Sequence, residues 1–107
     1  MGRLSRNKGA SFERKIARFF QSLGFLQARR KLSQYQESDG QDLENTEPYI
    51  VQCKTGEKIT ILEAYKEAKK ASKYQKSMVI PLAIIKYDRE DPLVVMSLED
   101  FGWHVKK

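Results

Sequence analysis

The apolar positions of this chain follow two different spacings, and each spacing predicts a different kind of element. In residues 10–23 they recur at intervals of three and four, which is typical of one face of a helix. Gly24, directly after this stretch, suits a helix end. We expect the buried stripe of this first helix to consist of Phe12, Ile16, Phe19 and Leu23.

A second helical spacing occupies residues 60–74. It begins at Thr60, and Glu63 stands three positions later, which is the spacing of a capping box. Alanines at 64, 68 and 71 would let this helix pack closely on a sheet. We expect its inner stripe to include Leu62, Tyr65, Ala68, the aliphatic stem of Lys69, and Ser72.

Shorter runs rich in β-branched and aromatic residues, bounded by turn-type residues, predict strands. The most apolar run, residues 79–87, indicates a buried strand with Pro81 near its start or at a sheet edge. The order of helix, three strands, helix and two strands predicts an α/β fold with a mixed sheet and helices packed against it. The other expected strands are residues 25–30, 41–44, 49–54 and 93–96, and Ser97 begins a short helical turn.

Residues 41–54 predict a hairpin that gathers chemically useful side chains. An Asn-Thr-Glu-Pro turn cluster separates its two strands, and a turn centred there places Asp42 opposite about residue 51. Side chains alternate along a strand, so Gln52 and Lys54 point one way and Cys53 points the other. A carboxylate, an amide oxygen and an ammonium brought together in this way can hold a hard divalent cation with a positive charge beside it.

Glu13 is a further candidate for this site. It lies roughly 100° from Phe12 around the first helix, at the edge of the apolar face. A carboxylate at that position can reach a site at the edge of the sheet. Alternatively, Glu13 is a surface residue that pairs with Arg14 and Lys15.

The size and charge of the chain narrow the kind of partner. Its 107 residues, 40% of them hydrophobic, suffice for one modest domain spanning residues 1–107. Lysine and arginine number 20 against 14 acidic residues, and residues 1–37 carry nine basic and two acidic residues. A basic first third favours a polyanionic partner, most simply nucleic acid, although a solvated, soluble surface can have the same composition.

Basic residues cluster at two places in this first third. Residues 1–9 lack apolar periodicity, and we expect a flexible basic arm that either tracks phosphates or is an ordinary frayed terminus. The basic run 29–31 precedes a polar loop, so the two together can clamp a phosphate backbone and stack an aromatic ring on a base or sugar. A solvated charged loop is the alternative. The candidate DNA-binding residues are Arg6, Lys8, Arg29, Arg30, Lys31, Ser33 and Tyr35.

The remaining residue types exclude some classes of protein. The single cysteine, Cys53, excludes a disulfide within the chain and fits a reducing compartment. No apolar run approaches membrane-spanning length and no signal-peptide core is visible, so we expect a cytoplasmic protein. His104, the lone histidine, is expected to be structural or exposed rather than a ligand or a general base.

The order of these motifs resembles the PD-(D/E)XK nuclease superfamily, and within it the archaeal-type Holliday junction resolvases and related phage resolvases. The likeness covers nearly the whole chain; each motif is weak singly, and their order and spacing carry the resemblance. The matching segments are Lys8-Gly-Ala-Ser-Phe-Glu13-Arg14, Leu23-Gly24-Phe25, the basic strand and serine-containing loop from Arg29 to Ser38, Asp42, Gln52-Cys53-Lys54, and Leu98-Glu99-Asp100-Phe101.

The resemblance implies a single restriction-endonuclease-like domain with an αβββαβ core. It also implies metal-dependent phosphodiester hydrolysis at four-way DNA junctions, in recombination and repair, by a symmetric homodimer in a bacterial, archaeal or phage-infected cell. Asp42 and the Gln52 amide oxygen would bind Mg²⁺ or Mn²⁺, with the Cys53 backbone carbonyl as a further ligand. Glu13 would complete the site directly or through water, and Lys54 would activate the attacking water and stabilise the developing charge.

Two positions depart from the family pattern. Gln41 precedes Asp42 where the family usually has proline, and Gln52 stands where it usually has glutamate. A neutral ligand at 52 should hold the metal less tightly than a carboxylate. The departures leave two other functions open: a different PD-(D/E)XK nuclease, of restriction or repair type, and a catalytically silent DNA-binding module.

Overall fold

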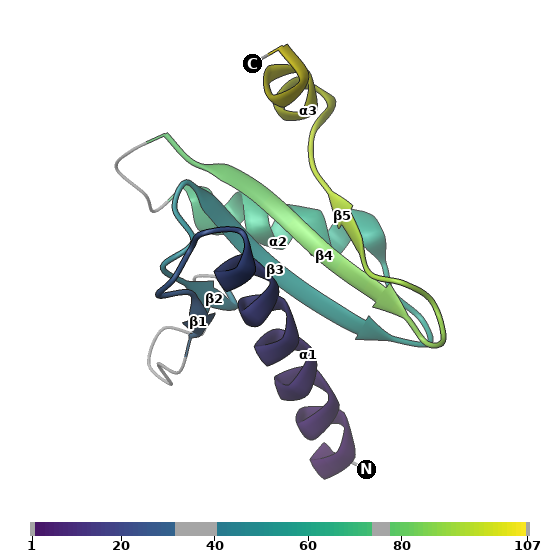
Figure 1. Ribbon diagram of the computed structural model, residues 1–107. Helices are drawn as coiled ribbons and strands as arrows, with labels where there is room; N and C mark the ends of the chain where they lie inside the picture. Colours follow the sequence, from purple (N-terminus) through teal and green to yellow (C-terminus); the bar gives the residue numbers. More distant parts are fainter. Residues whose placement is uncertain (1, 32–40, 74–77, 107) are drawn as a thin grey trace.

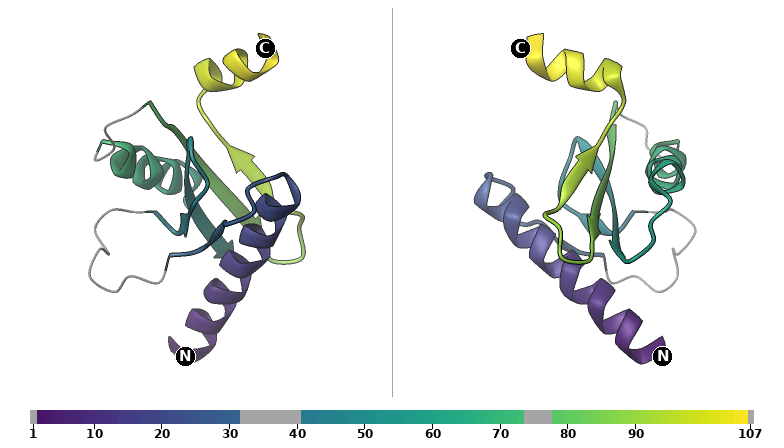
Figure 2. Two further views of the ribbon diagram at one scale, coloured as in Figure 1. Left: turned by 60° about the vertical axis from the view of Figure 1, so that its left-hand side comes forward. Right: turned by 90° about the vertical axis from the view of Figure 1, so that its right-hand side faces the viewer.

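A three-stranded mixed sheet lies between two helices. The computed structural model describes residues 2–31, 41–73 and 78–106, with side chains from Lys8 onward (Figure 1). Figure 2 shows α1 and α2 on opposite faces of the sheet, with α3 beyond its end. In chain order the elements are α1 (Gly2–Ser22), β1 (Arg29–Arg30), β2 (Leu43–Glu44), β3 (Tyr49–Gly56), α2 (Ile61–Ser72), β4 (Ile80–Tyr87), β5 (Leu93–Val95) and α3 (Leu98–Lys106).

The main sheet has the order β3-β4-β5. β3 and β4 run parallel, and α2 makes the crossover between them, as a parallel pair requires. β5 pairs antiparallel with β4 only over Ala83–Ile85, so Pro81 lies near the start of β4, outside that paired stretch, as expected. The predicted α/β class, mixed sheet and element order are therefore confirmed, with α3 as an additional helix.

The predicted hairpin forms only in part. β2 pairs antiparallel with β1, with Arg29 opposite Glu44, instead of extending a ladder along β3. The link to β3 is the main-chain hydrogen bond from the Asp42 amide to the Val51 carbonyl, at 2.8 Å. β1 is also shorter than the expected strand 25–30, because a turn closed by the Ala28 amide and the Phe25 carbonyl precedes it.

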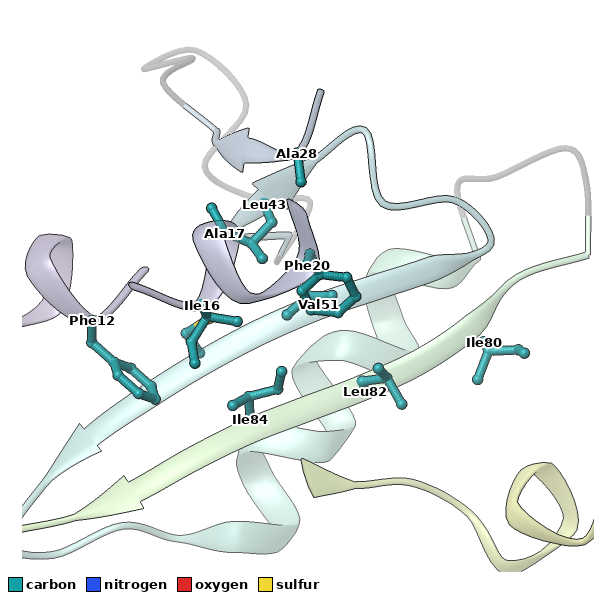
Figure 3. Packing of buried hydrophobic residues seen from close by; sticks show 11 residues of the cluster. Phe12, Ile16, Ala17, Phe20, Ala28, Leu43, Val51, Ile80, Leu82 and Ile84 are labelled. Atoms are coloured by element: carbon teal, nitrogen blue, oxygen red, sulfur yellow. The ribbon is translucent and has the colours of Figure 1, made fainter. Parts of the chain in front are cut away.

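Apolar side chains pack on both faces of the sheet. On one face, Phe12, Ile16 and Phe20 of α1 cover alternate residues of β3 and β4, including Val51 and Ile84 (Figure 3). On the other face, Ala64 of α2 packs against Ala83 and Ile85. Strand side chains alternate between faces, so each of the two central strands contributes to both cores.

The buried stripe of α1 differs from the predicted one. Phe19 and Leu23 are 56% and 58% exposed, whereas Ala17 and Phe20 are buried. At roughly 100° per residue, Glu13 falls between Phe20 and Ala17 around the helix. The buried face of α1 is therefore centred nearer to Glu13 than predicted. Glu13 lies among the residues of α1 that pack on the sheet.

The helix ends also differ from expectation. α1 begins at Gly2, so its first turns include residues 2–9, where the sequence predicted no helix. Thr60 is the N-cap residue of α2, as expected, but its side chain makes no capping hydrogen bond. The buried residues of α2 are Ala64, Ala68 and Ala71, while Leu62 of the predicted stripe is exposed. Close packing on the sheet thus uses the three alanines.

The C-terminal segment forms a nine-residue helix, α3, where a single turn was expected. His104 anchors it: the Tyr49 hydroxyl lies 2.7 Å from His104 Nε2, and His104 Nδ1 lies 2.8 Å from the Asp100 carbonyl. Since a carbonyl only accepts, Nδ1 carries the proton and Nε2 accepts from the tyrosine. The histidine is thus structural, as expected. Within the described ranges, no helix is long and apolar enough to cross a membrane.

Candidate functional site

Asp42 is fixed where the two small sheets meet. Its amide donates to the Val51 carbonyl at 2.8 Å, and its carbonyl accepts from the Lys31 amide at 2.9 Å. The Cys53 amide donates to Asp42 Oδ2 at 2.7 Å, so the side chain is held as firmly as the backbone. The predicted position of Asp42 opposite residue 51 is confirmed.

The surroundings of Asp42 disfavour its negative charge. Burial is the largest cause and, with the charges of Glu13 and Glu67, raises the pKa of Asp42 from 3.8 to about 6. The Cys53 amide and the Lys54 ammonium lower the pKa, but by less in sum. Burial and the two neighbouring negative charges destabilise the ionised form of Asp42, and a bound cation would stabilise it.

Glu13 of α1 is linked to the Asp42 region through Arg30 of β1. Its Oε1 accepts a hydrogen bond from Arg30 Nε at 2.9 Å, and both side chains are half-buried. The expected surface pairing with Arg14 or Lys15 is therefore replaced by a tertiary pair that joins α1 to β1. Since Arg30 immediately precedes Lys31, whose amide bonds to Asp42, this pair ties Glu13 to the backbone that holds Asp42.

Gln52 carries a buried acceptor that lacks a partner. The residue is 6% exposed, and its Oε1 has no hydrogen-bond partner among the described residues. Such orphans are rare in folded proteins, and a bound ion is one of their recognised causes. Lys54, two positions on and therefore on the same face of β3, has its Nζ 3.3 Å from Glu67 Oε2 of α2. Gln52 and Lys54 thus face α2, as the alternation predicted.

Cys53 faces the other way, into the core under α1. Burial, with the charges of Asp42 and Glu13, raises the pKa of its thiol well above the usual value, so the side chain is unsuited to be a nucleophile. The backbone of Cys53 is better placed than its side chain to contact a bound cation. The N–H and C=O of one strand residue point to the same edge, so the Cys53 carbonyl points to the edge where its amide meets Asp42.

The donors around this part of β3 are of the kind that a hard divalent cation takes. The Asp42 carboxylate and the Cys53 backbone carbonyl lie at the strand edge, and the unpartnered Gln52 amide oxygen lies on the face toward α2; all are oxygen ligands of the kind that Mg²⁺ accepts. No three His, Cys, Asp or Glu side chains of the described residues lie close enough together to hold a metal by themselves. A metal site here would therefore depend on neutral oxygen atoms as much as on acidic ones.

The predicted DNA-binding residues fall into three groups. Arg29 is paired with Glu44, Arg30 with Glu13 and Lys8 with Asp88, so each of these cations has an acidic partner. Lys31 contributes its backbone amide to the fixing of Asp42. The Arg6 side chain, Ser33 and Tyr35 lie outside what the structure describes, as does the loop that was expected to carry the last two.

Two features of this region were missed from the sequence. Arg14 and Arg18 of α1 line a groove with Arg29 and Arg30 of β1, so basic side chains from two elements share one surface. Their spacing of four residues on the polar side of α1 is the sequence signal for it. The second feature is Glu67, which touches Lys54 and acts on Asp42. In the sequence, Glu67 is one of several charged residues of α2, and its spacing does not distinguish it from the others.

Comparisons with known proteins found no relative of this chain. No protein-family model matches it, and neither the curated proteins nor the solved structures gave a match.

Proposed function

We propose that this protein is a structure-selective DNA endonuclease that hydrolyses phosphodiesters with a divalent metal at four-way junctions. The observation that carries the proposal is the buried Asp42 at the edge of β3, with its pKa raised to about 6 and the charge of Lys54 acting on it. Gln52, with its unpartnered oxygen, shares a face of β3 with Lys54. The element order, αβββαβ followed by β5 and α3, is consistent with the restriction-endonuclease-like core and with the resemblance to Holliday junction resolvases.

The chemistry assigns a task to each residue. Hydrolysis needs an in-line water, neutralised charge at phosphorus and support for the leaving oxygen. Mg²⁺ or Mn²⁺, when bound, would supply Lewis-acid polarisation of the phosphate. Asp42 would hold the metal with its ionised carboxylate, aided by the Gln52 amide oxygen and the Cys53 carbonyl. Glu13 would complete the site directly or through water, and Lys54 would orient the attacking water and stabilise charge on the phosphate.

The arginine groove supports a nucleic-acid substrate. Arg14, Arg18 and Arg29 line it together with Arg30, whose guanidinium is bonded to Glu13. A phosphate backbone bound in this groove would therefore pass beside the candidate site. Arginines on a helix face and a short strand recognise backbone charge and spacing rather than base edges, as expected of an enzyme that selects a DNA shape.

A symmetric homodimer fits paired cuts on a junction, and the surface offers a place for it. β5 is the outer strand of the sheet, and its exposed Leu93 and Val94 line an apolar groove with Phe19 of α1. Exposed apolar side chains of this density mark association surfaces. α3 adds Leu98, Phe101 and Val105, all exposed.

A second candidate function is a DNA-binding module without catalysis. It is favoured by Gln52, which stands where the family pattern has a carboxylate, and because no three His, Cys, Asp or Glu side chains of the described residues are grouped so that they could hold a metal. Such a module would retain the arginine groove and bind junctions without cutting them.

Incubation of the protein with labelled four-way, three-way and linear duplex DNA, with and without Mg²⁺ and Mn²⁺, tests the proposal. Metal-dependent cutting of the four-way junction alone is the expected result. Equal cutting of linear duplex would instead favour another nuclease of the superfamily. Tight junction binding with no cut under any metal would favour the silent module.

A further inference from the structure

Glu67 lies where α2 approaches the candidate site. Ala64, Ala68 and Ala71 are the buried residues of α2, so the helix backbone runs close to the sheet. Glu67 stands one position before Ala68 and therefore at the rim of this inner face. From there its Oε2 reaches Lys54 Nζ at 3.3 Å.

This contact leaves the Glu67 carboxylate available for another partner. Its side chain is 46% exposed and that of Lys54 is 42% exposed, and ion pairs so open to water contribute little to folding. Exposed side chains change rotamer within nanoseconds, so Glu67 can leave Lys54 without disturbing the core.

The region around Asp42 also contains negative charges and an unpartnered acceptor that a bound cation would neutralise. Glu13 and Glu67 both add negative charge near the buried Asp42, while the buried Gln52 Oε1 has no hydrogen-bond partner among the described residues. Gln52 and Lys54 share the face of β3 that α2 covers, so the orphan oxygen lies on the same side of the sheet as Glu67.

We propose that Glu67 supplies the second carboxylate of the metal site, replacing from α2 the acidic group that Gln52 does not provide on β3. The inference rests on the proposed function, because it names a ligand of that same site. Without metal, the Lys54 ion pair keeps Glu67 at the site. With metal bound, Glu67 would coordinate the cation, and Lys54 would be free to interact with the phosphate.

Titration of Mn²⁺ into the intact protein at pH 7.5, without DNA, tests this ligand by calorimetry. Glu67→Gln should weaken Mn²⁺ binding by about tenfold or more. Glu63→Gln is the matched control: it removes the same charge one turn earlier on α2, from a residue that is not among the charges acting on Asp42. Glu63→Gln should bind Mn²⁺ like the parent.

A second substitution separates a ligand from a residue that merely positions Lys54. Gln52→Glu moves a carboxylate onto β3, so in a Glu67→Gln background it should restore Mn²⁺ affinity to the parent level. If Glu67 only holds Lys54, Gln52→Glu would raise Mn²⁺ affinity by the same factor in the parent and in the Glu67→Gln background, whereas a ligand role makes the gain larger in the Glu67→Gln background. Unchanged Mn²⁺ affinity in Glu67→Gln, or an equal gain from Gln52→Glu in both backgrounds, overturns the inference.

The same experiment keeps this inference distinct from the proposed function. If the parent binds Mn²⁺ and cuts junctions while Glu67→Gln binds Mn²⁺ equally well, the inference alone fails. If the parent neither binds Mn²⁺ nor cuts any DNA, the proposed function fails and the inference with it. Thermal unfolding of each variant without metal verifies that every protein titrated is folded.

Discussion

Burial of the Asp42 carboxylate makes its charged form costly in the folded protein. Its folded-state pKa, about 6, lies above its ordinary value of 3.8. The folded protein therefore binds a proton more tightly than the unfolded chain. The contribution of this group to stability is fully present below pH 4 and is lost as the pH rises through 6.

Replacing Asp42 should therefore stabilise the protein in a pH-dependent way. Asp42→Asn keeps an acceptor for the Cys53 amide and removes the buried charge. We expect it to raise the free energy of unfolding by about 1–3 kcal/mol at pH 8 and by little near pH 4. Urea denaturation of both proteins at the two pH values measures the difference. A gain that is the same at both pH values would show that the charge is not its cause.

Gln52 should behave as a working but weak ligand. Gln52→Glu should tighten metal binding and leave cleavage intact or improved, because it adds a charge where an uncharged oxygen now stands. Gln52→Ala should impair cleavage and shift it to higher metal concentration. Cleavage rate against Mg²⁺ and Mn²⁺ concentration compares the three proteins. If Gln52→Ala titrates like the parent, Gln52 is no ligand, and Asp39, outside the described residues, is the first to test.

For single residues, the sequence predicts the positions that depend on neighbouring residues in the chain. The turn cluster before β3 and the alternation of strand side chains were enough to place Asp42 opposite residue 51 and Gln52 beside Lys54. The pairs Arg30–Glu13 and Lys54–Glu67 join residues on different elements, and only the packing of those elements decides them. Neither partner could be chosen from spacing along the chain.

The same distinction between local pattern and packing applies to the helices and strands. The apolar spacing of α1 is satisfied equally by a stripe ending in Phe19 and Leu23 and by one ending in Phe20, and the sheet selects the second. The short strands β1 and β2 pair with each other, although the sequence favoured β2 with β3. Length and periodicity predicted α2 and β4 well, since both are long and strongly patterned.

The basic surface shared by α1 and β1 should govern DNA binding. Replacing Arg29, Arg30 and Lys31 with alanine should flatten the slope of log affinity against log salt by about 0.9 for each phosphate that the variant no longer neutralises. The matched control removes Lys66, Lys69 and Lys70 from the outer face of α2 and should leave the slope unchanged. Binding is measured by fluorescence anisotropy across a salt series. Equal slopes for all three proteins would place the DNA surface elsewhere.

The whole molecule should be a dimer in solution. Exposed apolar side chains gather at the outer strand β5 and the adjoining part of α1, and one small domain offers one site for a reaction that needs two paired cuts. Light scattering of the parent should give twice the chain mass. Val94→Glu should shift it toward the monomer, whereas Leu62→Glu, an equally exposed position on α2, should not. A monomer even with junction DNA bound would contradict the resolvase proposal.

We propose Asp42 as the centre of a metal-dependent site that cuts branched DNA. The most direct measurement follows one labelled four-way junction with the parent and Asp42→Asn, recording binding and cleavage in the same samples with Mg²⁺ or Mn²⁺. We expect metal-dependent cutting by the parent protein, and undiminished binding without cutting by Asp42→Asn. Cleavage by Asp42→Asn at the parent rate would contradict it.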